Sequence, residues 1–251
     1  MKINDLLLQK VAAYKPDAGK IRSIADTPLV FVVGIAGAGK DTTQRELLKR
    51  HSAEYQFIVS HTTRKPRTNN GIQEQDGVDY HFIDLTTAEK MLDEGQYVEA
   101  NIVHYEDIYG TAISEIQAIK QARKIAISDI EVKGIDQYIQ LGLNVKPVFI
   151  IPPSFDVWWE RFQGRYKGQI DWYDALKRMR TALEELDDAM SRDYYYIVVN
   201  DELEKTVESV HRIALGTLTQ HRTTVGIETL RKFAADMAKN LESWRAEHTG
   251  L

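Results

Sequence analysis

The sequence predicts an α/β protein whose mostly parallel sheet is covered by helices on both faces. Segments expected to form strands alternate along the chain with segments of helical periodicity, which is typical of parallel sheets. The run from Pro28 to Val33 is apolar without alternation, as in a strand that is buried on both faces. A glycine-rich turn and then a helix follow this strand, so the sequence already indicates one strand–turn–helix unit.

Apolar spacing and turn residues set the expected elements. We expect strands at residues 28–33, 57–60, 97–103, 124–130, 145–151 and 194–199. We expect helices at residues 3–14, from the glycine-rich turn to about 50, and at 86–94, 112–123, 155–163, 173–192, 204–222 and 226–247. Residues 16–26 are expected to be a polar connector, and 61–78 a long loop or hairpin of the kind that is usually functional. The apolar spacing within 226–247 favours packing in the core or in a dimer over a ligand site.

Composition excludes several classes of protein. The 251 residues include no cysteine, which excludes disulfides, thiolate zinc sites and cysteine nucleophiles. The formal charge of −5 predicts no general attraction to nucleic acid or to an anionic membrane. The longest apolar run, 28–33, is too short to span a bilayer, and the N-terminus lacks the features of a signal peptide. We therefore expect a cytoplasmic protein.

The turn after the first expected strand has the pattern of a phosphate loop. Its glycines allow consecutive backbone N–H groups to face one anion, the following helix adds its dipole, and Lys40 supplies a charge for the β and γ phosphates. The alternative, a glycine-rich turn with an incidental lysine, would require three correctly spaced glycines by chance. The residues expected to bind the phosphates of a nucleoside triphosphate are Gly34, Ala36, Gly37, Ala38, Gly39, Lys40, Asp41 and Thr42.

One position of the loop departs from the usual pattern. The residue after the lysine is usually Ser or Thr, whose hydroxyl binds Mg²⁺, but here it is Asp41 and the hydroxyl of Thr42 follows. Two alternatives stay open: Mg²⁺ is held by Thr42 and water, or Asp41 is also one of its ligands. Asp129 ends the expected strand 124–130 and is a further candidate ligand, direct or through water, although it could also be a helix cap or a surface residue.

A second candidate anion site lies between residues 59 and 67. Pro66 prevents a regular helix there, so Arg64 and Arg67 can project from a loop toward one anion, and their planar guanidinium groups suit phosphate oxygens. Tyr80 and Tyr109 could add hydroxyl donors. Taken singly, the arginines could belong to a solvated basic loop and the tyrosines to packing.

Several ordered motifs together resemble the guanylate kinase family. They are Ser60–Arg67, Asp76–Phe82, Glu99, Tyr109–Thr111, Asp129–Gly134, Pro152–Ser154, Gly164–Arg165 and Val199–Leu203. The resemblance implies a P-loop kinase fold with three αβα layers, a five-stranded core sheet, a small acceptor-binding α+β subdomain at about 60–111 and a helical lid at about 161–178. The corresponding domain would be 28–220, with helical extensions at 1–27 and 221–251.

The resemblance also implies roles for individual residues. Arg64, Arg67, Tyr80 and Tyr109 would bind the phosphate of GMP, while Ser60, Glu99, Thr111 and Glu131 would read its base. Hydroxyl groups can donate to O6 of guanine, and ionised carboxylates can only accept, which suits its N1–H and N2–H groups. The catalytic set would be Lys40, Asp129, Arg161, Arg165 and Arg178. Asn200 would lie near adenine, although Asn-Asp after a strand is also ordinary turn chemistry.

The implied reaction is phosphorylation of GMP, and of dGMP, by Mg²⁺-bound ATP in one in-line transfer. ATP and GMP would be the partners, with no nucleic acid and no membrane, and a homodimer through the terminal helices is left open. Two alternatives remain. One is a kinase of the same fold with another acceptor, such as another nucleoside monophosphate or a ribose bisphosphate. The other is a non-catalytic binding module of guanylate-kinase-like fold.

Overall fold

The computed structural model describes residues 3–69, 71–103, 106–130, 132–164 and 170–248. The chain divides into two compact units. The first contains Met1–Leu29, Ala53–Ser128 and Lys133–Val145, and the second contains Val30–Ser52, Asp129–Val132 and Lys146–Leu251. Each unit is therefore assembled from separate stretches of sequence.

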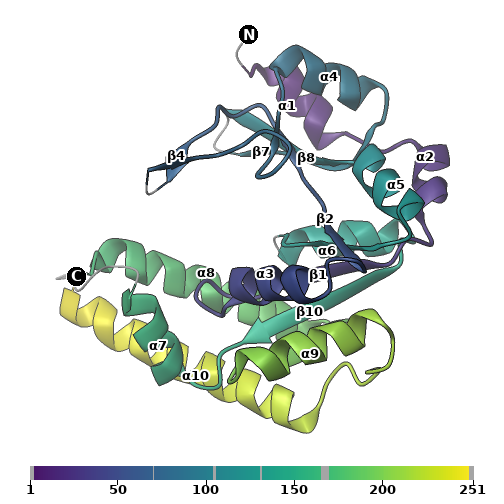
Figure 1. Cartoon of the computed structure of the whole chain (residues 1–251). Coiled ribbons are helices and arrows are strands. Elements are labelled where there is room, and N and C mark those ends of the chain that lie inside the picture. The colour runs from purple at the N-terminus through teal and green to yellow at the C-terminus, as the bar shows by residue number, and fades with distance from the viewer. Residues whose placement is uncertain (1–2, 70, 104–105, 131, 165–169, 249–251) are drawn as a thin grey trace. The chain divides into compact units, whose positions relative to one another are not determined.

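A five-stranded sheet confirms the predicted α/β class. Its strands are β1 (Leu29–Val33), β2 (Tyr55–Phe57), β9 (Ile125–Ser128), β10 (Val145–Ile151) and β11 (Tyr196–Val199), in the order β11-β10-β1-β9-β2. Figure 1 labels β1, β2 and β10 of this sheet. The pairs β10–β11 and β2–β9 are parallel. All five residues of β1 are buried, as its continuous apolar sequence predicts.

The first unit holds a separate four-stranded sheet in the order β6-β3-β8-β7. Its strands are β3 (His61–Thr62), β6 (His81–Phe82), β7 (Tyr97–Val103) and β8 (Asp107–Ala112). Strand β8 is antiparallel to both β7 and β3, and β3 is parallel to β6. The expected strand at 97–103 is thus present, but it belongs to this second sheet. The expected loop or hairpin at 61–78 contains β3 and the short hairpin of β4 (Thr68–Asn69) and β5 (Ile72–Gln73).

An apolar cluster joins helix α1 (Asp5–Ala12) to this sheet and to helix α4 (Leu85–Asp93). The side chain of Asn4 caps α1 by accepting a hydrogen bond from the backbone N–H of Leu7 at 2.9 Å. Leu7 is buried in the cluster with Ala88, Leu92, Tyr97, Ala100, Ile108 and Ala112. The predicted N-terminal helix therefore contributes to the core of the first unit.

Two helices of the first unit were not expected. Helix α2 (Ala18–Ile24) replaces the predicted polar connector, because Asp17 caps its first turn through the N–H of Lys20 and because Ile21 and Ile24 are buried. Helix α6 (Val132–Gln140) was also missed. Helix α5 (Ile113–Gln121) was expected, and strand β2 ends at Phe57, where the predicted strand began.

The helices of the second unit follow the predicted order. They are α3 (Lys40–Arg50), α7 (Phe155–Gln163), α8 (Trp172–Ser191), α9 (Leu203–Ala214) and α10 (Thr224–His248). Helix α3 packs against α9, and α9 packs against β11. Across the described part of the chain, no helix combines the length and the apolarity that a membrane span requires.

Helix α10 is docked within the second unit. It runs along α8 and also contacts α7 and β11 (Figure 1, yellow). Leu230, Phe233 and Met237 are buried at helical spacing, as the periodicity of this segment predicts. The C-terminal helix is therefore part of the core of this unit.

We predict that Phe233→Ala lowers the free energy of unfolding by about 3–5 kcal/mol, because the fully buried ring leaves a cavity. Chemical denaturation measures this change. The control is Lys239→Ala at an exposed position of the same helix, which we expect to unfold like the wild type. Equal denaturation midpoints for Phe233→Ala and the wild type would contradict the docking of α10.

Candidate functional site

The turn between β1 and α3 directs its carbonyl groups toward donors within the second unit. The Lys40 ammonium donates to the carbonyl oxygens of Gly34 and Ile35, the latter at 3.2 Å. The Trp158 indole donates to the carbonyl of Ala36 at 2.8 Å, and the Asn200 amide donates to that of Ala38 at 2.7 Å. Carbonyl groups held in this way leave the opposite, N–H side of the turn for an anion.

Two glycines of the turn allow these donors to approach. Gly37 and Gly39 have φ values of 90° and 95°, which favour glycine. A Cβ at Gly39 would lie 2.3 Å from Nδ2 of Asn200, and one at Gly37 would lie 3.1 Å from Nε1 of Trp158. Side chains at these positions would therefore force the supporting donors away from the loop.

A cavity of about 220 Å³ opens above the turn, at the N-terminus of α3. Its lining consists of Ala36, Gly37, Gly39, Lys40, Asp41, Thr42 and Asp129. Gly34 and Ala38, which were also predicted to bind phosphate, are buried and do not line it. The cavity thus combines the loop, the start of a helix and a lysine, as an anion site requires.

Oxygen ligands gather in the same cavity. The side chain of Asp129 reaches solvent, but the surrounding protein desolvates it and raises its pKa, and the charge of Asp41 raises the pKa further. Thr42 is exposed in the lining, whereas the hydroxyl of Thr43 is used on the carbonyl of Gly39 at 2.9 Å. A divalent cation would offset the charge of the two carboxylates, so these residues fit a hard cation with oxygen ligands.

The predicted lid arginines and Asn200, which were assigned to the ATP site, have different partners in the structure. Arg161 donates to the backbone carbonyl of Asn200 at 3.2 Å, and Arg178 pairs with Asp174 at 2.7 Å on α8. Arg165 lies outside the described residues. The side chain of Asn200 is buried, and its oxygen accepts from Thr206 at 3.0 Å while its nitrogen holds the loop. Its contact with adenine, like the lid at 161–178, stays a prediction.

In the first unit, Arg64 brings together most of the predicted phosphate-binding residues. Its guanidinium donates to the hydroxyl of Tyr109 at 2.7 Å and lies 5.4 Å from the centre of the Tyr80 ring. It also makes a two-pronged ion pair with Glu74 at 2.8 and 3.0 Å, which holds the pKa of the Glu74 carboxyl below its usual range. Glu74 accepts the backbone N–H of Arg67 as well, at 2.7 Å, while the Arg67 side chain is exposed. Glu74 was missed in the sequence, where nothing marks it as the partner of Arg64.

Three residues predicted to read the base form one row across neighbouring strands. Glu99 of β7 pairs with Thr111 of β8. His61, the first residue of β3, pairs with Gly110, and the same register continued to the preceding residue would set Ser60 beside Thr111. Cross-strand partners share one face of a sheet, which gathers the two hydroxyls and the carboxylate. The fourth predicted residue, Glu131, lies outside the described residues.

The Glu99 carboxylate is fixed by neighbours that the sequence did not reveal. It accepts from the backbone N–H of Thr111 at 3.1 Å and from the amide of Asn101 at 2.9 Å. Burial raises its pKa, and the hydrogen bonds from Thr111 and Asn101 act in the opposite direction. Tyr138 is fully buried on the unexpected helix α6.

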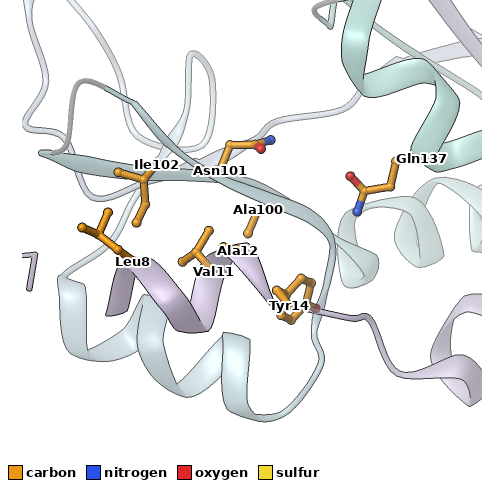
Figure 2. Close-up of a pocket in the computed structure, with 8 residues that line it drawn as sticks. All are labelled: Leu8, Val11, Ala12, Tyr14, Ala100, Asn101, Ile102 and Gln137. Atoms are coloured by element: carbon orange, nitrogen blue, oxygen red, sulfur yellow. The ribbon is translucent and has the colours of Figure 1, made fainter. Parts of the chain in front are cut away.

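A second cavity, of about 330 Å³, adjoins this row in the first unit (Figure 2). Its lining consists of Leu8, Val11, Ala12, Tyr14, Ala100, Asn101, Ile102 and Gln137. Asn101 is both part of this lining and a donor to Glu99. Figure 2 shows Leu8, Val11 and Ala12 of the N-terminal helix on one side of β7, while Asn101 points to the other side.

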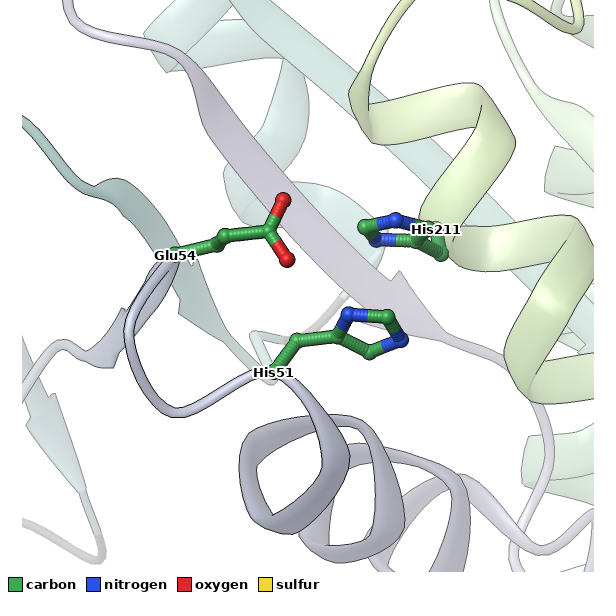
Figure 3. A group of neighbouring side chains, drawn as sticks. All are labelled: His51, Glu54 and His211. Atoms are coloured by element: carbon green, nitrogen blue, oxygen red, sulfur yellow. The ribbon is translucent and has the colours of Figure 1, made fainter.

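Two histidines of the second unit form a stacked pair (Figure 3). The ring centres of His51 and His211 lie 3.8 Å apart, and the ring planes differ by 18°. Imidazole lone pairs lie in the ring plane, so the lone pairs of nearly parallel rings do not converge on one point. This geometry favours packing over a metal ion shared by the two rings.

Comparisons with known proteins identify the family of the chain. The family model of guanylate kinase matches residues 26–215. Guanylate kinase of Schizosaccharomyces pombe is 34% identical over 199 residues, which cover 79% of this chain and 95% of that relative. Guanylate kinase 1 of Oryza sativa subsp. japonica is 33% identical over 185 residues, which cover 73% of this chain but only 47% of that longer relative.

A solved structure shows the same fold. The crystal structure of guanylate kinase from Anaplasma phagocytophilum matches with a TM-score of 0.54 and 21% sequence identity, and the match covers 84% of this chain and 94% of that chain. The family match spans most of the sequence, and one relative of 34% identity is matched over nearly its whole length. The chain therefore belongs to the guanylate kinase family.

Proposed function

We propose that this chain transfers the γ-phosphoryl group of ATP to GMP, and to dGMP, giving ADP and the nucleoside diphosphate. The observation that carries the proposal is the cross-strand pairing of Glu99 with Thr111 in the unit that also holds the Arg64–Tyr109 pair. That unit thus presents groups for a purine base and groups for a phosphate. Family membership supports the same assignment.

The donor nucleotide would bind at the phosphate loop. Backbone N–H groups, the N-terminus of α3 and Lys40 supply positive potential around the cavity above the loop. The Lys40 ammonium donates to the carbonyl oxygens of Gly34 and Ile35. It would turn from these to the β and γ phosphates of ATP.

The acceptor would be recognised by charge and by hydrogen-bond pattern. Arg64 and the hydroxyls of Tyr80 and Tyr109 would bind the phosphate of GMP, with Glu74 keeping the Arg64 guanidinium oriented beforehand. Glu99 would accept from N1–H and N2–H of guanine, and Thr111 and Ser60 would donate to O6. Adenine would leave the buried carboxylate unpaired, which is the basis of discrimination.

Mg²⁺ would be held by Asp129 and Thr42, directly or through water, with Asp41 in the same cavity. Bound there, the ion would neutralise charge on the β and γ phosphates. All three side chains offer oxygen ligands, which suits this cation.

The transfer needs positioning and charge neutralisation rather than a covalent intermediate on the protein. A phosphate oxygen of GMP attacks the γ-phosphorus, the new P–O bond forms as the bond to the β–γ bridging oxygen breaks, and ADP leaves. Lys40 stabilises the charge that spreads over the transferred group. Arg161, Arg165 and Arg178 are the candidates to add to it from the predicted lid.

We predict that a coupled assay of ADP formation, run with GMP, dGMP, AMP, CMP, UMP and ribose phosphates, finds activity with the guanine nucleotides. We expect kcat/KM for GMP to exceed that for AMP on the order of 10⁴-fold, because a site built to pair with N1–H and N2–H penalises a base that lacks them. Lys40→Ala is the control that assigns the activity to this chain. Higher activity with AMP, or with a ribose phosphate, would reject GMP as the acceptor.

We also predict that Glu99→Gln raises KM for GMP by roughly ten- to a hundredfold, because a charged acceptor is lost, and leaves KM for ATP unchanged. Steady-state kinetics with each substrate varied in turn measure both constants. Glu106→Gln, at an exposed position of the β7–β8 hairpin, is the matched control. An equal rise of both KM values would show that Glu99 has no specific role in reading the acceptor.

A further inference from the structure

The phosphate loop is supported from helix α7 by one indole group. The Nε1–H of Trp158 donates to the carbonyl of Ala36 at 2.8 Å. The same edge of the ring lies against Gly37, where an added Cβ would be 3.1 Å from Nε1 and 3.4 Å from Cδ1. Ala36 and Gly37 both line the cavity proposed to receive ATP phosphates. Trp158 therefore contacts the reverse side of the loop directly beneath this cavity.

The indole of Trp158 is fixed by the aromatic side chains around it. It is only 1% exposed, it stacks on Phe162 with ring centres 4.8 Å apart and planes 24° apart, and it lies 5.4 Å from the ring of Phe155. Phe233 of α10 meets it edge-on at 6.2 Å. A ring packed on several sides has little freedom to turn its N–H away from the loop.

Helix α10 completes this aromatic cluster from outside the family match, which ends at residue 215. Besides Phe233, it contributes Trp244, whose ring lies 4.3 Å from Trp159 and 5.7 Å from Phe155. The C-terminal helix thus packs on the same face of α7 that carries the loop contact. This gives the extension a defined connection to the nucleotide site.

We propose that Trp158 is a positioning residue for phosphoryl-donor binding, acting by holding the carbonyl of Ala36 so that the N–H groups of the loop face the phosphates of ATP. The proposal rests on the proposed binding of ATP at this loop. Trp158 itself would touch neither substrate. Its loss would weaken binding of any ligand that the loop recognises through phosphate groups alone.

The test replaces the indole N–H while keeping the shape of the side chain. Site-specific incorporation of 3-benzothienylalanine at position 158 substitutes sulfur for N–H in a bicyclic ring of nearly the same size. Calorimetry then measures the affinity for ATP and for inorganic tripolyphosphate, which has no base or ribose. We expect both affinities to fall by the same factor, roughly three- to tenfold, since one hydrogen bond to the loop is lost. Steady-state kinetics should show a matching rise in KM for ATP and no change in KM for GMP.

Trp158→Phe is a second variant that removes the same donor, and Trp159→Phe is the matched control at the neighbouring position. The Trp159 ring contacts Phe162 and Trp172 in the same cluster, so its substitution tests loss of aromatic packing. Thermal unfolding of all three variants reports stability separately from affinity.

Unchanged affinity for tripolyphosphate in the benzothienylalanine variant would overturn the proposal, as would an equal loss of affinity in Trp159→Phe. If the wild type binds ATP but does not phosphorylate GMP, the proposed function fails while the comparison of affinities still decides the role of Trp158.

Discussion

The orientation of the backbone between Gly34 and Lys40 is the constraint on which the second unit depends. A peptide turn can offer its N–H groups to an anion only if its carbonyl groups face elsewhere and find donors there. The donors that stay in place are Trp158 on α7 and Asn200 after β11, because Lys40, which also donates to this turn, would move to the phosphates of ATP. The requirement explains why glycines occupy positions 37 and 39, since side chains there would meet Trp158 and Asn200. The elements around the turn between Gly34 and Lys40 thus stabilise one backbone conformation of that turn.

A comparable arrangement is present in the first unit, where Glu74 pairs with Arg64 and accepts the backbone N–H of Arg67. A guanidinium with 8% exposure and a carboxylate with 13% exposure form a two-pronged pair, and the same carboxylate fixes the backbone at Arg67. Removing one partner of such a pair leaves a buried charge unpaired, which is strongly destabilising. Preorganisation of Arg64 and strand register at Glu99 therefore act together to shape the proposed acceptor site.

The sequence predicted those parts of the fold that local signals specify. The apolar run at 28–33, the glycine spacing and Lys40 were sufficient to predict the β1–loop–α3 unit. Each of these features acts on the conformation of its own segment of backbone. The helix α2 was missed although Asp17 is a good N-cap, because the segment is short and its apolar face has only Ile21 and Ile24. The hairpin partner of β7 was missed because Gly110 interrupts the short apolar run of β8, and glycine is uncommon inside strands.

The candidate site shows the same difference between residues that sequence motifs identify and residues that only the folded chain brings together. The ordered motifs predicted that Arg64, Tyr80 and Tyr109 belong to one site, and in the structure these side chains are in contact. Trp158 could not be singled out, because a tryptophan at helical spacing has the same pattern whether it only packs or also donates a hydrogen bond. Glu74 and Tyr138 are likewise defined by partners distant in sequence. The adenine contact of Asn200 stays a prediction, and the motif did not reveal that its side chain is buried against the loop.

The central claim is that donors on the carbonyl side of the loop control phosphate binding, and Asn200 tests it most directly. Asn200→Leu keeps a similar volume but removes the donor to Ala38, and calorimetry can compare its affinity for ATP with its affinity for tripolyphosphate. The account predicts that both affinities fall by the same factor, roughly three- to tenfold, because the loop recognises phosphate groups in both ligands. A loss of affinity for ATP with unchanged affinity for tripolyphosphate would contradict it and would assign Asn200 to the base instead.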